Sequence, residues 1–126
     1  SCEKRHIIHI ETLLYEVMGL DAQIEWNAKI FKALSDPKRL RIIEMLSCGE
    51  LCACEILEKF HITQPTLSHD MKLLCDAGLL KARRDGKWMY YSLNEENVQI
   101  FKQFICRITS DTPDCICKKC SLKNND

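Results

Sequence analysis

The sequence contains little glycine or proline, no net charge and no long hydrophobic run. Only 4 Gly and 3 Pro occur among its 126 residues, whereas small secreted scaffolds held by disulfides are usually shorter and richer in both. No apolar stretch approaches the roughly 18–20 residues of a membrane-spanning helix. Residues 1–6 lack the basic segment and apolar core of a secretory signal. We therefore expect a cytoplasmic protein with reduced thiols and no membrane partner.

Nine cysteines are present instead, which is a high number for a chain of this length. Several of them gather in two stretches, residues 48–54 and 115–120. Clustered cysteines are typical of metal or redox sites, whereas structural disulfides usually join distant segments. The hydrophobic fraction of 46% and the charged fraction of 29% are those of a globular domain. We expect one domain over residues 1–110 and a cysteine-rich tail over 111–126.

The formal charge of zero is an average over regions of opposite sign. Residues 61–91 hold five basic and three acidic side chains, whereas residues 1–36 hold four basic and six acidic ones. Nucleic-acid binding depends on the local distribution of charge rather than on its sum. The neutral total therefore does not exclude a DNA-binding function.

The hydrophobic pattern predicts a mostly helical chain of α+β class with one hairpin. Asp36 and Thr63 are expected helix caps, each with a proline in the first turn that follows, and Asp21 is expected to cap an earlier helix. Asp85-Gly86 is a standard hairpin signal. The expected helices cover 7–17, 21–34, 36–46, 51–60, 63–77 and 94–108, and the expected strands cover 79–84 and 88–93.

Two short helices followed by a basic two-stranded hairpin have the outline of a winged helix-turn-helix. The second helix begins with short polar side chains, which contact base edges and phosphates in such folds. The alternative is a polar helix face that serves only for solvation, but the order of elements favours double-stranded DNA as the partner. We assign the DNA contacts to Gln64, Thr66, Ser68, His69, Lys72, Arg83, Arg84 and Lys87.

Several stretches of the chain resemble the ArsR/SmtB family of metal-responsive repressors. They are FKALSDPKRLRII at 31–43, QPTLSHDMKLL at 64–74, AGLL at 77–80 and RRDGKWMYYSL at 83–93. The resemblance covers about residues 26–108 and implies a homodimeric winged-helix repressor that leaves its operator on binding a thiophilic ion. The expected dimer contacts are two apolar segments near the chain ends, 7–17 and 98–105. The family usually has His where Asp70 stands, which leaves the role of this acidic residue open.

The segment ELCACE at 50–55 resembles the family motif ELCVCD, which binds arsenite in some members and cadmium or lead in others. Thiolates select soft ions, and As(III) takes three sulfur ligands in a pyramid. Side chains two residues apart on a helix point about 200° apart. Joint binding by Cys52 and Cys54 is therefore predicted to unwind the start of the 51–60 helix and to re-aim the recognition helix. The alternative is that either cysteine is a small buried hydrophobe.

The source of a third sulfur is open. Arsenite sensors of this type carry it three residues after the CxC pair, where this chain has Leu57. Cys48 is our first candidate, and Cys2 of the partner subunit is another, as in some cadmium and lead sensors. The tail offers thiols near lysines that favour the thiolate, as a second site or an auxiliary donor, or else it is a frayed terminus with no folded role. The tail candidates are Cys115, Cys117 and Cys120.

Other positions are expected to have no ligand role. Cys75 and Cys106 lie on apolar helix faces and are expected in the core. The family's zinc site on the last helix is expected to be absent, because the matching stretch from Glu95 to Asp111 contains no histidine.

Three functions of the same fold follow. They are a repressor released by As(III) or Sb(III), a Cd(II) or Pb(II) sensor, and a thiol redox switch. No catalytic Cys-His-acid set or phosphate-binding glycine loop is present, so we expect no enzyme and no organic cofactor.

Overall fold

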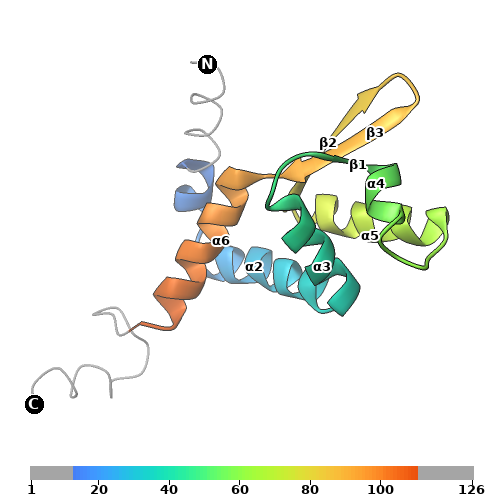
Figure 1. The fold of residues 1–126 in the computed structure, drawn as a ribbon. Helices are drawn as coiled ribbons and strands as arrows, with labels where there is room; N and C mark the ends of the chain where they lie inside the picture. The colour runs from blue at the N-terminus through green and yellow to red at the C-terminus, as the bar shows by residue number, and fades with distance from the viewer. Residues whose placement is uncertain (1–12, 111–126) are drawn as a thin grey trace, which may run out of the picture.

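The computed structural model describes residues 13–110. These residues form helices and one small sheet, with residues 13–17 helical at the start. Figure 1 shows the β2–β3 hairpin projecting from the helical body on the side of α4 and α5. The elements in chain order are α2 (Leu20–Leu34), α3 (Pro37–Leu46), β1 (Leu51–Cys52), α4 (Ala53–Leu57), α5 (Gln64–Asp76), β2 (Leu80–Asp85), β3 (Trp88–Leu93) and α6 (Glu95–Ile108).

Side-chain caps start three of the helices. An oxygen of Asp36 accepts a hydrogen bond from the Lys38 amide at 2.7 Å, which begins α3. Thr63 caps α5 in the same way, and Asn94 caps α6. The caps expected at 36 and 63 are thus confirmed. The cap expected at Asp21 is wrong, because the N-cap of α2 is Gly19 and Asp21 lies in the first turn, where its charge favours the helix dipole.

The wing hairpin ends in a two-residue turn. Asp85 still pairs with Trp88, so the turn consists of Gly86 and Lys87, one residue later than expected. Gly86 has φ of 61°, in the left-handed region that such turns require at this position.

A third strand joins the hairpin where the sequence predicts the start of a helix. β1 pairs antiparallel with β3, with Cys52 opposite Tyr90, and the sheet order is β1-β3-β2. The predicted helix over 51–60 is therefore wrong at both ends, because α4 covers only Ala53–Leu57. A helix of only five residues gains little from its own hydrogen bonds. The exposed edge of β3 offers the Leu51–Cys52 backbone partners that the isolated segment lacks.

The core lies where α3, α4 and α5 meet the base of the sheet. Its most buried members include Ile42, Ile56 and Leu74, each fully shielded from solvent. On α6 the buried residues are Ile100 and Phe104, and Val98 and Phe101 are half-buried and pack against the core.

The two cysteines expected in the core have different environments. Cys75 is half-buried, as expected of a core position, and burial raises the pKa of its thiol. Cys106 is exposed on the single chain, so the expectation that it belongs to the core is wrong.

Candidate nucleic-acid interface and thiol site

The recognition helix α5 separates an apolar face from a polar one. Leu67, Met71 and Leu74 are buried against the body. The side chains that the sequence assigns to DNA lie on the other face, where all of them are exposed: Gln64, Thr66, Ser68, His69 and Lys72. One rigid helix therefore presents five polar groups to a partner in solution.

The wing carries the basic residues assigned to DNA, and one of them has a protein partner. Arg83, Arg84 and Lys87 are all exposed. The guanidinium of Arg83 donates to both carboxylate oxygens of Glu50, at 2.6 and 3.2 Å, and its carbon lies 4.5 Å from the centre of the Tyr90 ring. This ion pair lowers the pKa of Glu50 and raises that of Arg83. Glu50, two residues before Cys52, thus holds the Arg83 side chain in place.

Asp70 does not face the surface proposed for DNA. Its side chain is buried, and its two oxygens lie 2.8 Å from Lys38 Nζ and 3.2 Å from Arg39 Nη1. The same Arg39 nitrogen lies 3.2 Å from Asp36, and Nε of Arg39 donates to the Ala33 carbonyl at 2.6 Å. The role of Asp70 is therefore structural, because its ion pairs with Lys38 and Arg39 join α5 to the first turn of α3. Neither basic partner of Asp70, Lys38 or Arg39, was predicted from the sequence.

The thiols of Cys52 and Cys54 lie side by side. Cys52 is the N-cap of α4, with φ −74° and ψ 147°, whereas Cys54 lies in the first turn. Their sulfurs are 3.0 Å apart, with Cys52 buried and Cys54 exposed. The expectation that an intact helix separates the two thiols is wrong, because Cys52 is extended and lies outside the helix. The two thiols therefore lie together without any unwinding.

The surroundings of Cys54 favour its protonated form. The hydrogen bond with the Cys52 sulfur raises the pKa of the Cys54 thiol, and partial desolvation and charge repulsion act in the same direction. A soft ion that bound here would therefore have to displace the proton of Cys54. Glu55 stabilises the arrangement, because its carboxylate accepts a hydrogen bond from the Cys52 amide at 3.0 Å.

Among the described residues, no third potential ligand lies beside the thiol pair. Within residues 13–110, no group of three His, Cys, Asp or Glu side chains is arranged to hold a metal ion. Cys48, the first candidate, is exposed just beyond the end of α3. The other candidates, Cys2 and the tail residues Cys115, Cys117 and Cys120, lie outside the described residues.

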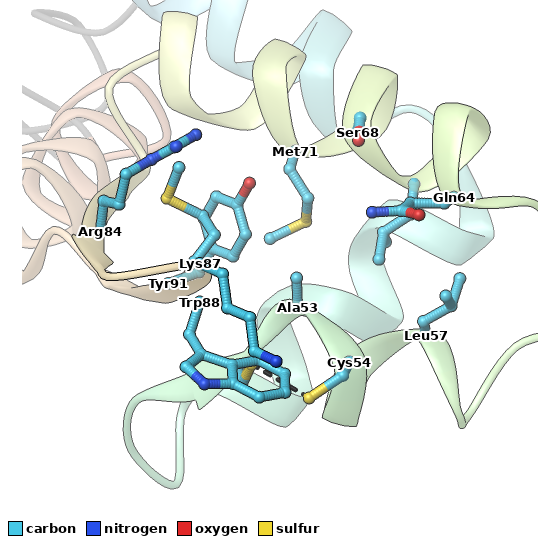
Figure 2. A pocket seen from close by; sticks show the side chains of 13 residues that line it. Ala53, Cys54, Leu57, Gln64, Ser68, Met71, Arg84, Lys87, Trp88 and Tyr91 are labelled. Atoms are coloured by element: carbon cyan, nitrogen blue, oxygen red, sulfur yellow. Dashed lines mark hydrogen bonds between the residues drawn. The ribbon is translucent and has the colours of Figure 1, made fainter.

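A cavity of about 410 Å³ opens beside the thiol pair, between α4, α5 and the wing. Figure 2 shows Cys54 and Leu57 on one side, Met71 and Ser68 on α5, and the wing across the opening. The apolar members of this lining, among them Trp88 and Tyr91, were not predicted from the sequence. The wing residues that line the cavity are Arg84, Lys87, Trp88, Met89 and Tyr91.

Comparisons with known proteins find similar chains among bacterial regulators. The sequence pattern of the family described as "Bacterial regulatory protein, arsR family" matches residues 36–82. An arsenical resistance operon repressor from Staphylococcus xylosus is 48% identical over 89 residues, which are 71% of this chain and 86% of that protein. A cadmium resistance transcriptional regulatory protein CadC homolog from Staphylococcus aureus is 45% identical over 73 residues, 57% of this chain and 60% of that protein.

A solved structure shares the fold. It is the homodimeric winged helix-turn-helix DNA-binding domain of a possible ArsR-family transcriptional regulator from Mycobacterium bovis. It is 28% identical, with a TM-score of 0.59, and the match covers 71% of this chain and 83% of that one. The winged-helix class predicted from the sequence is thereby confirmed.

Proposed function

This chain belongs to the ArsR family of bacterial regulatory proteins, and from that premise we propose that it is an arsenite-responsive repressor. It binds operator DNA as a homodimer in the cytoplasm and releases it when As(III) binds Cys52 and Cys54. The observation that carries this proposal is the 3.0 Å separation of the two thiols at the junction of the wing and the helix-turn-helix.

The exposed polar face of α5 and the basic wing provide the DNA contacts. The α5 residues enter the major groove, and Arg84 and Lys87 reach the phosphates beside it. A two-fold pair of such domains addresses two half-sites about one helical turn apart.

Exposed apolar side chains support the homodimer. Leu14, Val17 and Leu20 are 63%, 82% and 54% exposed, and Ile24 and Ile108 add to the same kind of surface. Large exposed apolar patches mark interaction sites. We assign this surface to the dimer contact, with residues 1–110 as one domain and 111–126 as a separate cysteine-rich tail.

The ion assigned to the pair is As(III), because thiol pairs bind thiophilic ions and the Staphylococcus xylosus relative is an arsenical resistance repressor. The third sulfur comes from Cys48, from the partner's Cys2, or from the tail through Cys115, Cys117 or Cys120. Sb(III) shares this chemistry. Cd(II) or Pb(II), with a fourth sulfur, is the second candidate, favoured by the cadmium resistance relative.

The position of the thiols suggests how an ion bound at Cys52 and Cys54 lowers the affinity for operator DNA. The Cys52 backbone belongs to β1 and pairs with Tyr90 of β3, while Cys54 belongs to α4. An ion that draws a third sulfur toward the pair displaces the junction of β1 and α4. That displacement is transmitted to the wing through β3, and to α5 through α4. Release of the operator therefore requires no unwinding of a helix.

Substitution of single cysteines tests the proposal. Cys52→Ser and Cys54→Ser are expected to bind operator DNA as tightly as the wild type and to lose arsenite-induced release, measured by fluorescence anisotropy of labelled DNA. Cys106→Ser is the matched control and should respond normally. Unchanged release in the first two variants would move the site to the tail, and release by peroxide but not by arsenite would favour the redox switch.

A further inference from the structure

The indole of Trp88 lies on the face of β3 that adjoins the thiol pair. Cys52 lies opposite Tyr90 in the pairing of β1 with β3, so both side chains leave the sheet on the same face. Side chains two residues apart on a strand share a face, which places Trp88 on this face as well. Because the pairing is antiparallel, the residues that follow Cys52 approach Trp88 rather than Ser92. Trp88 is therefore the residue of this face that the chain meets as it enters α4.

The arrangement around the cavity agrees with this placement. Cys52, Cys54 and Trp88 line the same cavity of about 410 Å³, and α4 lies against β3. Figure 2 shows the indole extending from the wing toward Cys54. Cys52 is only 5% exposed although it belongs to an edge strand, whereas Trp88 is 46% exposed. The indole thus lies beside the thiols at the edge of the solvent, where it can move without disturbing the core.

Trp88 also contacts the residue at the tip of the wing. Nζ of Lys87 lies 5.1 Å from the centre of the Trp88 ring, within the range of a cation–π interaction. Lys87 belongs to the two-residue turn of the hairpin, and it is one of the residues that we assign to operator phosphates. The orientation of this cation therefore depends on the position of the indole.

We propose that Trp88 is a positioning residue that couples the thiol pair to the tip of the wing. An ion bound at Cys52 and Cys54 displaces the indole, and the indole moves Lys87 away from its phosphate. This inference rests on the proposed function, because it uses the same thiols and the same DNA contact. It adds a route through side chains to the route through the backbone of β1, β3 and α4.

The displacement follows from the space that an ion and its third ligand require. The sulfurs of the pair are 3.0 Å apart, and As(III) with a third sulfur must enter the space beside them, which the cavity and the indole share. Leu67 and Met71 line the same cavity but are 2% and 1% exposed, so the packed core holds them in place. Trp88 is the largest side chain of the lining and lies partly in solvent. It is therefore the side chain that yields.

A variant with one tryptophan tests whether the indole responds to the ion. Trp26→Phe removes the other tryptophan of the chain. Arsenite is then titrated while the emission of Trp88 and the anisotropy of labelled operator DNA are followed together. We expect the emission to change in proportion to the release of the operator, and to stay constant when Cys54→Ser is added. Constant emission during release of the operator would overturn the inference.

Substitution of Trp88 tests whether the indole transmits the effect. The coupling ratio of each protein is its operator affinity without arsenite divided by its affinity at saturating arsenite, and native mass spectrometry counts the bound arsenic. Trp88→Ala is expected to bind as much arsenite as the wild type and to lose about tenfold in this ratio. Trp88→Phe keeps an aromatic ring beside Lys87 and should recover most of the loss. Met89→Ala is the matched control, because its side chain lies on the opposite face of β3; it should keep the wild-type ratio.

A double variant tests the last step of the route. Lys87→Gln removes the cation that contacts the indole, and its coupling ratio should fall as that of Trp88→Ala does. The variant with both substitutions should have a ratio no lower than that of the weaker single variant, because two residues on one route are not additive. Losses that multiply would overturn the route through Lys87.

The outcomes separate this inference from the proposed function. A Trp88→Ala protein with the wild-type coupling ratio would overturn the inference and leave arsenite sensing intact. A Trp88→Ala protein that no longer binds arsenite would also overturn it, because the indole would then belong to the ion site itself. If the wild type keeps its operator while arsenite is bound, the proposed function fails.

Discussion

At the scale of single residues, burial gives the charge of Asp70 a structural role. An acid in the middle of a recognition helix is unfavourable beside phosphates. In the structure its side chain turns inward, where Lys38 and Arg39 compensate the charge. The pair of basic partners lies 31 or more residues away in sequence, so no local pattern connects them with Asp70. This residue therefore positions α5 rather than reading DNA.

Loss of this buried acid is expected to destabilise the fold. Asp70→Ala leaves two basic side chains without their shared partner, and we expect a loss of about 2 kcal/mol in the free energy of unfolding. The value lies below that for a fully buried pair because the Lys38 side chain is still 25% exposed. Chemical denaturation measures the change. Asp76→Ala, at the exposed end of the same helix, should change stability by less than about 0.5 kcal/mol, and equal effects would contradict the assigned role.

At the scale of elements, the wing and the thiol motif form one unit. β1 carries Cys52 and pairs with β3, and Glu50 just before it binds Arg83 of β2. The strands of the wing were predicted from the hydrophobic pattern and the Asp85-Gly86 turn signal. The third strand was not predicted, because two residues carry no periodicity and their pairing depends on a strand that comes almost forty residues later.

The Glu50–Arg83 pair is expected to weaken DNA binding. Glu50→Gln frees the Arg83 charge for phosphate contact, so operator affinity should rise severalfold at low salt. The slope of log affinity against log salt concentration should steepen by about 1. A salt series of anisotropy titrations measures both quantities. Glu44→Gln, an exposed position on α3, controls for the loss of one negative charge, and equal slopes in the two variants would show that the ion pair has no role in DNA binding.

At the scale of the whole molecule, apolar side chains remain exposed on the single chain. Helical residues 13–17 and the start of α2 contribute Leu14, Val17 and Leu20. Figure 1 shows these segments beside α6, at the opposite end of the molecule from α5 and the wing. A dimer through this end leaves both recognition helices available to DNA, which agrees with the sequence expectation of contacts through the terminal helices.

A charge in this surface is expected to separate the subunits without unfolding them. Val17 is 82% exposed, so Val17→Asp should leave the monomer fold intact. It should weaken dimerisation by about a hundredfold because a carboxylate would be buried at the contact. Sedimentation velocity measures the oligomeric state. Leu40→Asp, on the exposed side of α3, is the matched control; a dimer unaffected by Val17→Asp would exclude this surface as the contact.

The sequence by itself determined the winged helix-turn-helix class, the caps of α3 and α5, and the polar face of α5. These features depend on residues that are close in sequence, through helical periodicity, capping and turn chemistry. Only the tertiary structure decided that Asp70 faces α3, that Arg83 binds Glu50, and that the Cys52 and Cys54 sulfurs meet beside a cavity. Each of these contacts joins segments brought together by folding, or depends on a strand pairing that gives Cys52 an extended backbone. Their geometry is fixed by the packing of the whole domain rather than by local sequence.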